Sequence, residues 1–223
     1  MTVGFRIAPS APPVDPALVE AFRAIPASIV SDCMSRMTAS AAGIRPRHAG
    51  GALAGTALTV LTRPGDNLML HKAIDMARPG DVIVVDGGGD LTNALMGEIM
   101  LTLATRRGVA GFVIDGAIRD SEAIAAQKLP VYARGITHRG PYKDGPGEIN
   151  AVIQVGGMVV HPGDLMLGDA DGVLAVRAAE APAILQAARA TVAKEEAMLA
   201  AIADGTLDRS WVDATLKARG CAC

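Results

Sequence analysis

The sequence is poor in aromatic residues and has no excess of positive charge, and these shortages exclude a class of ligand. Aromatic residues make up 3% of the 223 residues, and 21 Lys and Arg stand against 23 Asp and Glu. A nucleic-acid surface usually carries a basic stripe with interleaved aromatic residues, which this sequence lacks. We therefore expect no direct binding of nucleic acid.

Cysteine is also scarce, and three cysteines make no disulfide framework. Cys33 falls in a segment expected to be helical, whereas Cys221 and Cys223 form a C-x-C at the end of the sequence. Because chain ends usually fray, we expect this C-x-C to be a frayed end rather than a metal site.

Residues 1–16 contain no continuous apolar run of the length that a signal peptide or a membrane span requires. Their prolines favour an extended arm, placed at residues 1–15. A cytoplasmic location without membrane contact is the expectation.

Common catalytic motifs are missing as well: the sequence has no G-x-G-x-x-G, P-loop lysine, H-E-x-x-H or G-x-S-x-G. Schiff-base chemistry is possible in principle at Lys72, Lys128 or Lys143, and no pattern singles one of them out. Four histidines without ligand spacing are expected to be structural: His48, His71, His138 and His161. Of these, His138 lies in a long loop and is the one that could face a site.

Half of the residues are apolar, which suits one globular domain over residues 1–223. Asp15 as N-cap and Pro16 at the first position predict a short helix that Pro26 closes, and residues 27–37 suggest a second helix.

An alternation of strands and helices follows, which predicts βα units and a largely parallel sheet with helices packed on it. The predicted strands are 51–62, 79–89, 109–115 and 130–137, and the predicted helices are 67–77, 93–108 and 119–129. Residues 138–150 form a long Gly/Pro-rich loop, and residues 151–176 read as three short antiparallel or mixed strands. Two helices within residues 179–219 end the chain.

The segment "DGGGDLTNALMGEIM" offers a possible anion site. In a βα unit the loop after the strand lies where ligands usually bind, and a helix that begins near Gly97 would offer the amides of Ile99 and Met100. The alternative is a tight glycine turn with a helix that starts earlier, and this segment alone leaves both open.

The segment "GVAGFVIDGAIRD" repeats this geometry and places Arg119 and Asp120 at the same edge. Arg can grip a carboxylate with two hydrogen bonds, and Asp suits a hard cation such as Mg²⁺. In the alternative, Arg119 pairs with Asp115 while Asp120 is an N-terminal helix charge. Spacing alone favours this alternative.

Further acidic residues are ambiguous. Glu98 would add a second carboxylate if both loops meet at one edge, and is otherwise an exposed helix residue. The "KEEA" run in the last long helix is by default a solvated face.

Taken together, "PGDVIVVDGGG", "NALMGEIM", "GVAGFVIDGAIRD" and "HPGDLMLGDADGVLAV" resemble the family that groups the regulator of ribonuclease activity A (RraA) with the 4-hydroxy-4-methyl-2-oxoglutarate aldolases. The resemblance covers residues 27–205. It implies an α/β fold of the swivelling β/β/α type, with a mixed sheet partly closed into a barrel-like sandwich and C-terminal helices reaching a neighbouring subunit. It also implies a homotrimer or homohexamer with active sites between subunits.

The resemblance further implies a role for each site residue. Asp120 would hold Mg²⁺, Mn²⁺ or another divalent cation directly, and Arg119 would contact the pyruvate part of a 2-oxo acid substrate. The backbone of Gly97, Glu98, Ile99 and Met100 would bind its carboxylate. Glu98 would orient metal-bound water together with a glutamate from an adjacent subunit, for which Glu195 matches best and Glu196 is close.

The implied activity is a class II retro-aldol cleavage that releases pyruvate, with oxaloacetate decarboxylation possible through the same enolate. Arg119, Asp120 and Glu98 are its catalytic residues. The rival is a non-catalytic regulator that binds a ribonuclease. Because this chain continues for some fifty residues past the point where the short regulators end, the enzyme is favoured.

Overall fold

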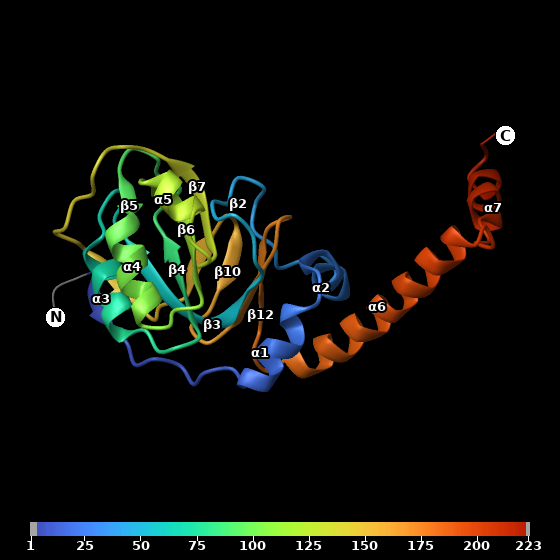
Figure 1. Ribbon diagram of the computed structural model, residues 1–223, viewed down its shortest axis with the longest axis horizontal. Helices are drawn as coiled ribbons and strands as arrows, with labels where there is room; N and C mark the ends of the chain where they lie inside the picture. Colours follow the sequence, from blue (N-terminus) through green and yellow to red (C-terminus); the bar gives the residue numbers. More distant parts are fainter. Residues whose placement is uncertain (1–3, 222–223) are drawn as a thin grey trace.

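A 10-stranded mixed sheet forms the centre of the computed structural model, which describes residues 4–221 (Figure 1). The strands are β1 (Phe5–Ile7), β2 (Arg45–Pro46), β3 (Leu53–Thr62), β4 (Asp81–Asp86), β5 (Ala94–Met96), β6 (Gly111–Ile118), β7 (Val131–Ile136), β8 (Gly147–Ile149), β9 (Ile153–Val155), β10 (Met158–Val160), β11 (Leu165–Gly168) and β12 (Val173–Val176). The helices are α1 (Pro16–Arg23), α2 (Ala27–Cys33), α3 (Leu68–Met76), α4 (Glu98–Arg106), α5 (Ser121–Ala125), α6 (Ala181–Ala203) and α7 (Ser210–Ala218).

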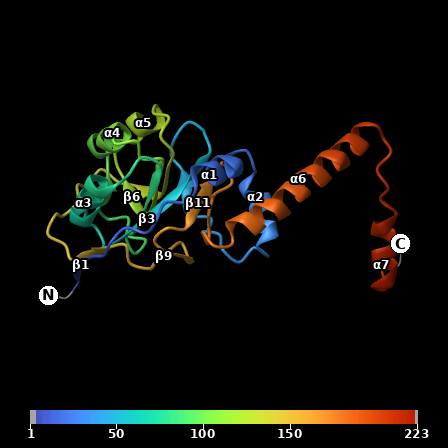
Figure 2. The same ribbon diagram turned by 90° about the horizontal axis from the view of Figure 1, so that it is seen from below.

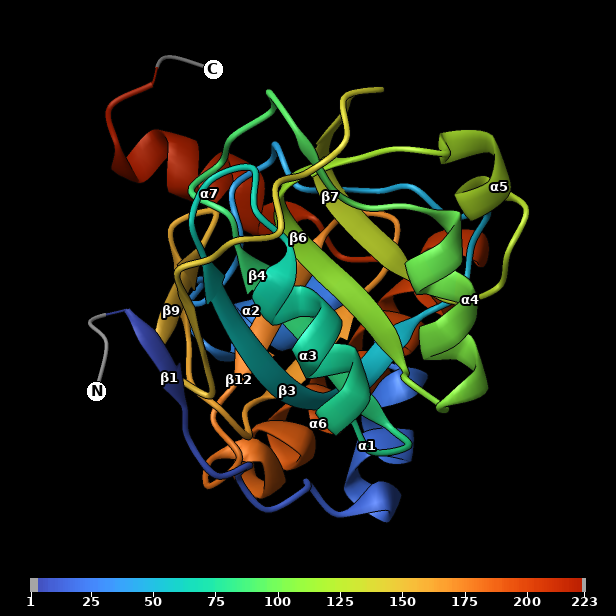
Figure 3. The same ribbon diagram turned by 90° about the vertical axis from the view of Figure 1, so that its left-hand side faces the viewer.

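The predicted βα units are confirmed. Strands β3, β4, β6 and β7 are parallel neighbours, and α3, α4 and α5 are the connections between them. Figure 3 shows α3 and α4 in front of these strands, on one face of the sheet. Leu70 and Ile74 of α3 and Leu101 of α4 are fully buried in one core with Ile83 and Ile114 of the sheet.

The other face of the sheet is covered by antiparallel strands. β9 and β10 form a separate 2-stranded sheet, and Val155 and Val160 from it pack with Val84 and Val113 in a second core. A third core joins α1, α2 and the start of α6 to β11 and β12. The prediction of a mixed α/β sheet flanked by helices is therefore correct.

Over the residues that the structure describes, the sheet is not closed into a barrel, contrary to the expectation of a partly closed, barrel-like sandwich. Within residues 4–221 the strand path β1-β8-β3-β4-β6-β7-β2 has two open ends, while β11 and β12 branch from β3 and β5 joins β6. The branching arises because β3 is long: its first half pairs with β11 and its last three residues pair with β8.

Four sequence predictions need correction. The helix predicted at 93–108 begins only at Glu98, because residues 94–96 form strand β5 beside β6. The helix predicted at 119–129 shrinks to α5. The loop 138–150 contains strand β8, and the region predicted as three strands has four, because a Gly156-Gly157 turn separates β9 from β10. Strand β8 forms because it pairs with the distant strands β1 and β3, whereas β9 and β10 pair with each other across that turn.

The last two helices leave the body of the molecule. Only Ala181, Leu185 and Ala188 of the 23-residue α6 are buried, and α7 has no buried residue. Figures 1 and 2 both show α6 projecting outward, with α7 folded at its far end. Within residues 4–221, no helix is both long and apolar enough to span a membrane.

Candidate active site

The two loops singled out in the sequence meet at one edge of the sheet. Strand β5 runs parallel to the end of β6, and the backbone N–H of Arg119 donates to Met96 O at 2.9 Å. This pairing places Gly97, the N-cap of α4, beside Arg119 and Asp120. Helix α4 therefore begins at the predicted site, and the alternative of an earlier helix start is wrong.

Gly97 lies so close to Asp120 and Arg119 that an added Cβ would force their side chains to shift. A Cβ on Gly97 would overlap Asp120 Oδ2 and would lie 3.1 Å from Arg119 Cγ and 3.2 Å from Arg119 Nε. The Gly97 backbone is in an ordinary extended conformation, so close approach to these side chains, and not backbone strain, favours glycine at this position.

The N-terminus of α4 supplies donors to the site. The first N–H groups of a helix have no partner within it, and here the first intrahelical bond is donated by Leu101 N to Gly97 O. Asp120 Oδ2 accepts the N–H of Glu98 at 3.0 Å. The N–H groups of Ile99 and Met100 remain as donors for an anion at this positive helix end.

Arg119 and Asp120 form only a weak pair with each other. Arg119 Nε lies 3.7 Å from Asp120 Oδ2, and the two side chains are 42% and 41% exposed, so solvent screens their attraction. Asp120 also adopts a left-handed backbone conformation, with φ 56° and ψ 42°. Non-glycine residues in this region often mark functional sites.

The structural alternative for Arg119 is wrong, because Asp115 has another partner. Its Oδ1 is bonded to Arg134 Nε, and its Oδ2 accepts the N–H of Gly156 at 2.6 Å. The hydrogen bond to Asp115 raises the pKa of Arg134 above its ordinary value. Asp115 thus ties β6 to β7 and to the β9–β10 turn, and leaves Arg119 available for a ligand.

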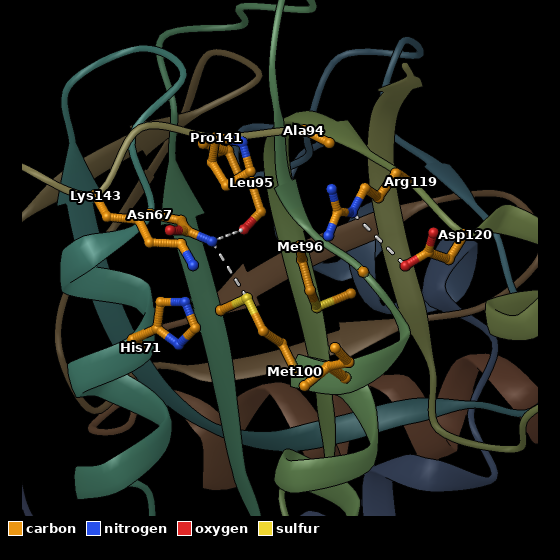
Figure 4. A pocket seen from close by; sticks show the side chains of 12 residues that line it. Asn67, His71, Ala94, Leu95, Met96, Met100, Arg119, Asp120, Pro141 and Lys143 are labelled. Carbon is orange, nitrogen blue, oxygen red and sulfur yellow. Dashed lines mark hydrogen bonds and ion pairs between the residues drawn. The ribbon is translucent and has the colours of Figure 1, made fainter. Parts of the chain in front are cut away.

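A small pocket of about 110 Å³ opens between this edge and α3 (Figure 4). It is lined by Asn67, His71, Ala94, Leu95, Met96, Gly97, Ile99, Met100, Arg119, Asp120, Pro141 and Lys143. Five of these were predicted from the sequence: Gly97, Ile99, Met100, Arg119 and Asp120.

The wall opposite Arg119 was missed. It consists of Asn67, His71 and Lys143, which come from the start of α3 and from the 138–150 loop. No local pattern marks these residues, although the length of the loop suggested a functional segment. His138, the one histidine that the sequence left open as a residue facing the site, is exposed and lines a second, more open pocket together with Arg119 and Asp120.

The remaining predicted site residues are acidic and exposed. Glu98 starts α4 with its side chain in solvent, outside the residues that line the pocket. Glu195 and Glu196 lie on the exposed half of α6, away from this edge of the same chain. Cys221 is exposed, and Cys223 lies outside the described residues, so the C-x-C prediction is not tested.

The donor set fits a cation held by few protein ligands. Within residues 4–221, no group of three or more His, Cys, Asp and Glu side chains is arranged to hold a metal. Asp120 uses Oδ2 for the α4 N–H, so Oδ1 is the oxygen that can face a cation. Mg²⁺ commonly binds through one or two carboxylates and keeps several waters, which this arrangement permits.

The chain matches the family model Aldolase/RraA over residues 27–175. It belongs to the RraA-like family. The matched segment includes α4, Arg119, Asp120 and all the residues that line the pocket. The resemblance drawn from the four sequence motifs is therefore correct.

Some RraA-like relatives of this chain are named as aldolases and others as inhibitors of RNA processing. A protein of Halalkalibacterium halodurans, provisionally named 4-hydroxy-4-methyl-2-oxoglutarate aldolase, is 42% identical over 83% of this chain and 89% of its own length. The RNA-processing inhibitor RraA of Thermus thermophilus is 31% identical, with a TM-score of 0.63 over 67% of this chain and 91% of its own. An uncharacterised protein of Pseudomonas syringae has a TM-score of 0.79 at 25% identity, over 88% and 97% of the two chains.

Proposed function

We propose that the chain is a divalent-metal-dependent class II aldolase that cleaves a 4-hydroxy-2-oxo diacid into pyruvate and a second oxo acid. The observation that carries this proposal is the meeting of Arg119, Asp120 and the amide donors of α4 in one small pocket. The similarity to a relative provisionally named as such an aldolase over 83% of the chain supports it.

Each group has a part in binding the 2-oxo acid. The N–H groups of Ile99 and Met100 bind the C1 carboxylate at the N-terminus of α4. Gly97 and Glu98 form the turn that presents these donors, and the Glu98 N–H is itself taken by Asp120 Oδ2. Arg119 donates to the oxygen that becomes negative when the carbon–carbon bond breaks. Preorganised donors of this kind are typically worth 10²- to 10³-fold in rate.

The cleavage follows from this placement. A cation such as Mg²⁺ or Mn²⁺, held by Asp120, would supply Lewis-acid stabilisation of the developing enolate. Loss of the proton from the C4 hydroxyl breaks the C3–C4 bond, the second oxo acid leaves, and the electron pair becomes the pyruvate enolate. Glu98 orders the water that takes this proton and returns it to C3. The same enolate forms when oxaloacetate loses CO₂, so decarboxylation is a second expected activity.

A second copy of the chain completes the site in this proposal. Met198, Leu199 and Ile202 on the projecting α6 and Trp211 on α7 are 44%, 65%, 57% and 65% exposed, which is unusual for large apolar side chains gathered on one extension. We propose that α6 and α7 of each chain reach the site of a neighbouring copy in a trimer or hexamer. Glu195 of one copy then orders the proton-accepting water together with Glu98 of the other. The swivelling β/β/α arrangement is part of the same proposal.

The test is a panel of 2-oxo acids incubated with the purified protein and either Mg²⁺ or Mn²⁺. Pyruvate release from 4-hydroxy-4-methyl-2-oxoglutarate, CO₂ release from oxaloacetate, and loss of both with EDTA are the expected results. An Asp120→Asn variant run beside the wild type should be inactive. Full activity in that variant, or in EDTA, would contradict the proposed role of the cation.

A regulator of RNA processing is the second candidate, favoured by the similarity to RraA of Thermus thermophilus. The alignment takes up 91% of that chain but only 67% of this one, so this chain is the longer of the two. Absence of turnover with either metal, together with tight binding to a ribonuclease scaffold, would favour the regulator.

A further inference from the structure

The pocket wall that faces Arg119 and Asp120 has a cation of its own. Lys143 lines this wall with Asn67 and His71, and none of the three has a part in the proposed cleavage. Figure 4 shows the Lys143 side chain running alongside Asn67 toward His71, across the pocket from Arg119. Asp120 is the single acid among the lining residues, on the far side, so the pocket has a cation at each end.

Asn67 carries an unsatisfied acceptor at this wall. The residue is 2% exposed, and its Nδ2 donates to Leu95 O at 3.0 Å and approaches Met100 Sδ at 3.4 Å. These two contacts fix which end of the amide carries the nitrogen. Oδ1 is buried and has no hydrogen-bond partner within residues 4–221. Because buried acceptors are almost always satisfied, this oxygen calls for a donor.

The backbone around Lys143 is held firmly beside Asn67. The buried Asp66 accepts the N–H groups of Asp144 at 2.7 Å and Gly145 at 2.9 Å through Oδ2. On the other side of Lys143, Tyr142 O accepts the N–H of Asn67 at 3.0 Å. The base of the lysine side chain is thus fixed on both sides, while its four-carbon stem can still move.

The Lys143 ammonium also acts on His71. Burial lowers the pKa of His71, and the positive charge of Lys143 lowers it further, whereas Asp75 raises it. His71 is therefore neutral near pH 7, so it does not compete with Lys143 for an anion.

We propose that Lys143 selects dicarboxylic 2-oxo acids. Its ammonium binds the second carboxylate of a substrate whose C1 carboxylate lies at α4, and the same ammonium donates to Asn67 Oδ1. Asn67 is then a positioning residue for Lys143. A lysine has three donors, so it can serve both oxygens at once. This inference rests on the proposed binding of a 2-oxo acid at Arg119.

The experiment compares two ligands that differ only at the far end. Calorimetric titration of the Mg²⁺-loaded protein with 2-oxoglutarate and with 2-oxopentanoate measures the preference for a second carboxylate without any turnover. The wild type should prefer 2-oxoglutarate by about tenfold, the size of one charge-assisted hydrogen bond. Lys143→Met should lose this preference while binding 2-oxopentanoate as the wild type does. Lys72→Met, at a lysine of α3 outside the pocket, is the matched control.

Asn67 is tested by a double-mutant cycle. Asn67→Leu alone should reduce the preference for 2-oxoglutarate over 2-oxopentanoate. Added to Lys143→Met, it should not change that preference further, because the effects of coupled residues are not additive. A purely structural role would weaken both acids equally and would overturn the role of Asn67.

Other outcomes separate this inference from the proposed function. Equal binding of the two acids by the wild type, or parallel weakening of both in Lys143→Met, would overturn the role of Lys143 and leave the aldolase proposal standing. Borohydride trapping of pyruvate on Lys143 would also overturn it, since the lysine would then form a Schiff base. Failure of the wild type to bind either acid would overturn both proposals.

Discussion

Asp120 Oδ2 accepts the backbone N–H of Glu98 at 3.0 Å, across 22 positions of the sequence. One carboxylate thus connects the end of β6 to the start of α4 and fixes the distance between the two halves of the candidate site. The two oxygens of Asp120 have different tasks in the proposed enzyme, because Oδ2 caps the helix and Oδ1 faces the cation.

This division predicts different results for two substitutions at the same position. Asp120→Asn keeps an oxygen that can accept the Glu98 N–H, so its thermal stability should match the wild type. Asp120→Ala removes the cap and should lower stability by about 1 kcal/mol. Pyruvate release should be lost in both variants, since neither has the charge that holds the cation. Thermal unfolding and the aldolase assay measure the two effects, and residual activity in Asp120→Asn at the wild-type level would contradict the assignment.

Gly97→Ala should damage the site more than the fold. The added Cβ overlaps Asp120 Oδ2 and presses on the Arg119 side chain, so both residues must move. Misplacement of this kind costs on the order of 100-fold in rate. Gly140→Ala is a graded control, because its Cβ would meet only the tip of Arg119, at 3.3 Å from Nη1. Comparison of kcat in the two variants, with circular dichroism to verify folding, checks this; equal losses would argue against close packing at Gly97.

Substitution of Arg134 should reduce stability, whereas substitution of Arg119 should reduce activity. Arg134→Met removes the hydrogen bond between Arg134 Nε and the buried Asp115 carboxylate and leaves that carboxylate the hydrogen bond from the Gly156 N–H. We expect a loss on the order of 2 kcal/mol in the free energy of unfolding, since half of a largely buried ion pair is removed. Arg119→Lys should keep stability and lose 10²- to 10³-fold in kcat/KM. Urea denaturation and steady-state kinetics on both variants separate the two; a stability loss confined to Arg119→Lys would reverse the roles of the two arginines.

The parts of the fold that depend on local chemistry could be predicted from the sequence. Asp15 caps α1 with Pro16 at its first position, as expected from residue type alone. Buried parallel strands that alternate with helices gave the βα order, and therefore the edge at which Arg119 and Asp120 would lie. For Arg119, residue spacing favoured a structural ion pair, and only the family resemblance favoured a substrate contact.

The remaining parts depend on pairing between distant segments. Residues 94–96 are apolar and could extend a helix, but pairing with β6 makes them a strand. Lys143 reaches the pocket because Asp66, nearly eighty positions earlier, fastens its loop. Neither event leaves a periodic signal, and for the same reason the sequence did not distinguish Lys143 from Lys72 or Lys128.

His71 should make stability depend on pH. Its pKa is lowered from 6.5 by burial and then by Lys143. Between pH 6.5 and the lowered value, the unfolded chain binds a proton that the folded chain does not, so stability falls as the pH decreases through this range. The free energy of unfolding of the wild type, measured by urea denaturation relative to that of His71→Gln, should therefore decrease from pH 7.5 to pH 5.5. Lys143→Met removes one cause of the lowered His71 pKa, so it should narrow the pH range over which stability changes. A stability difference between wild type and His71→Gln that is constant with pH would contradict the assignment.

The acid contributed by α6 can be identified by mixing inactive chains. Consecutive residues of a helix point about 100° apart, so Glu195 and Glu196 cannot both face one site. We expect Glu195→Gln to lose activity and Glu196→Gln to keep it. If Glu195 serves the pocket of a neighbouring copy, Asp120→Asn and Glu195→Gln chains that are unfolded, mixed equally and refolded should regain activity.

The size of this recovery follows from symmetry. In a closed ring each site takes Asp120 from one chain and Glu195 from the next, so about one quarter of the sites are intact after random mixing. Mixing either inactive variant with itself gives the baseline, and size-exclusion chromatography verifies that the oligomers have re-formed. Activity that stays at the baseline in re-formed oligomers would place both residues in the site of the same chain, or remove Glu195 from the site.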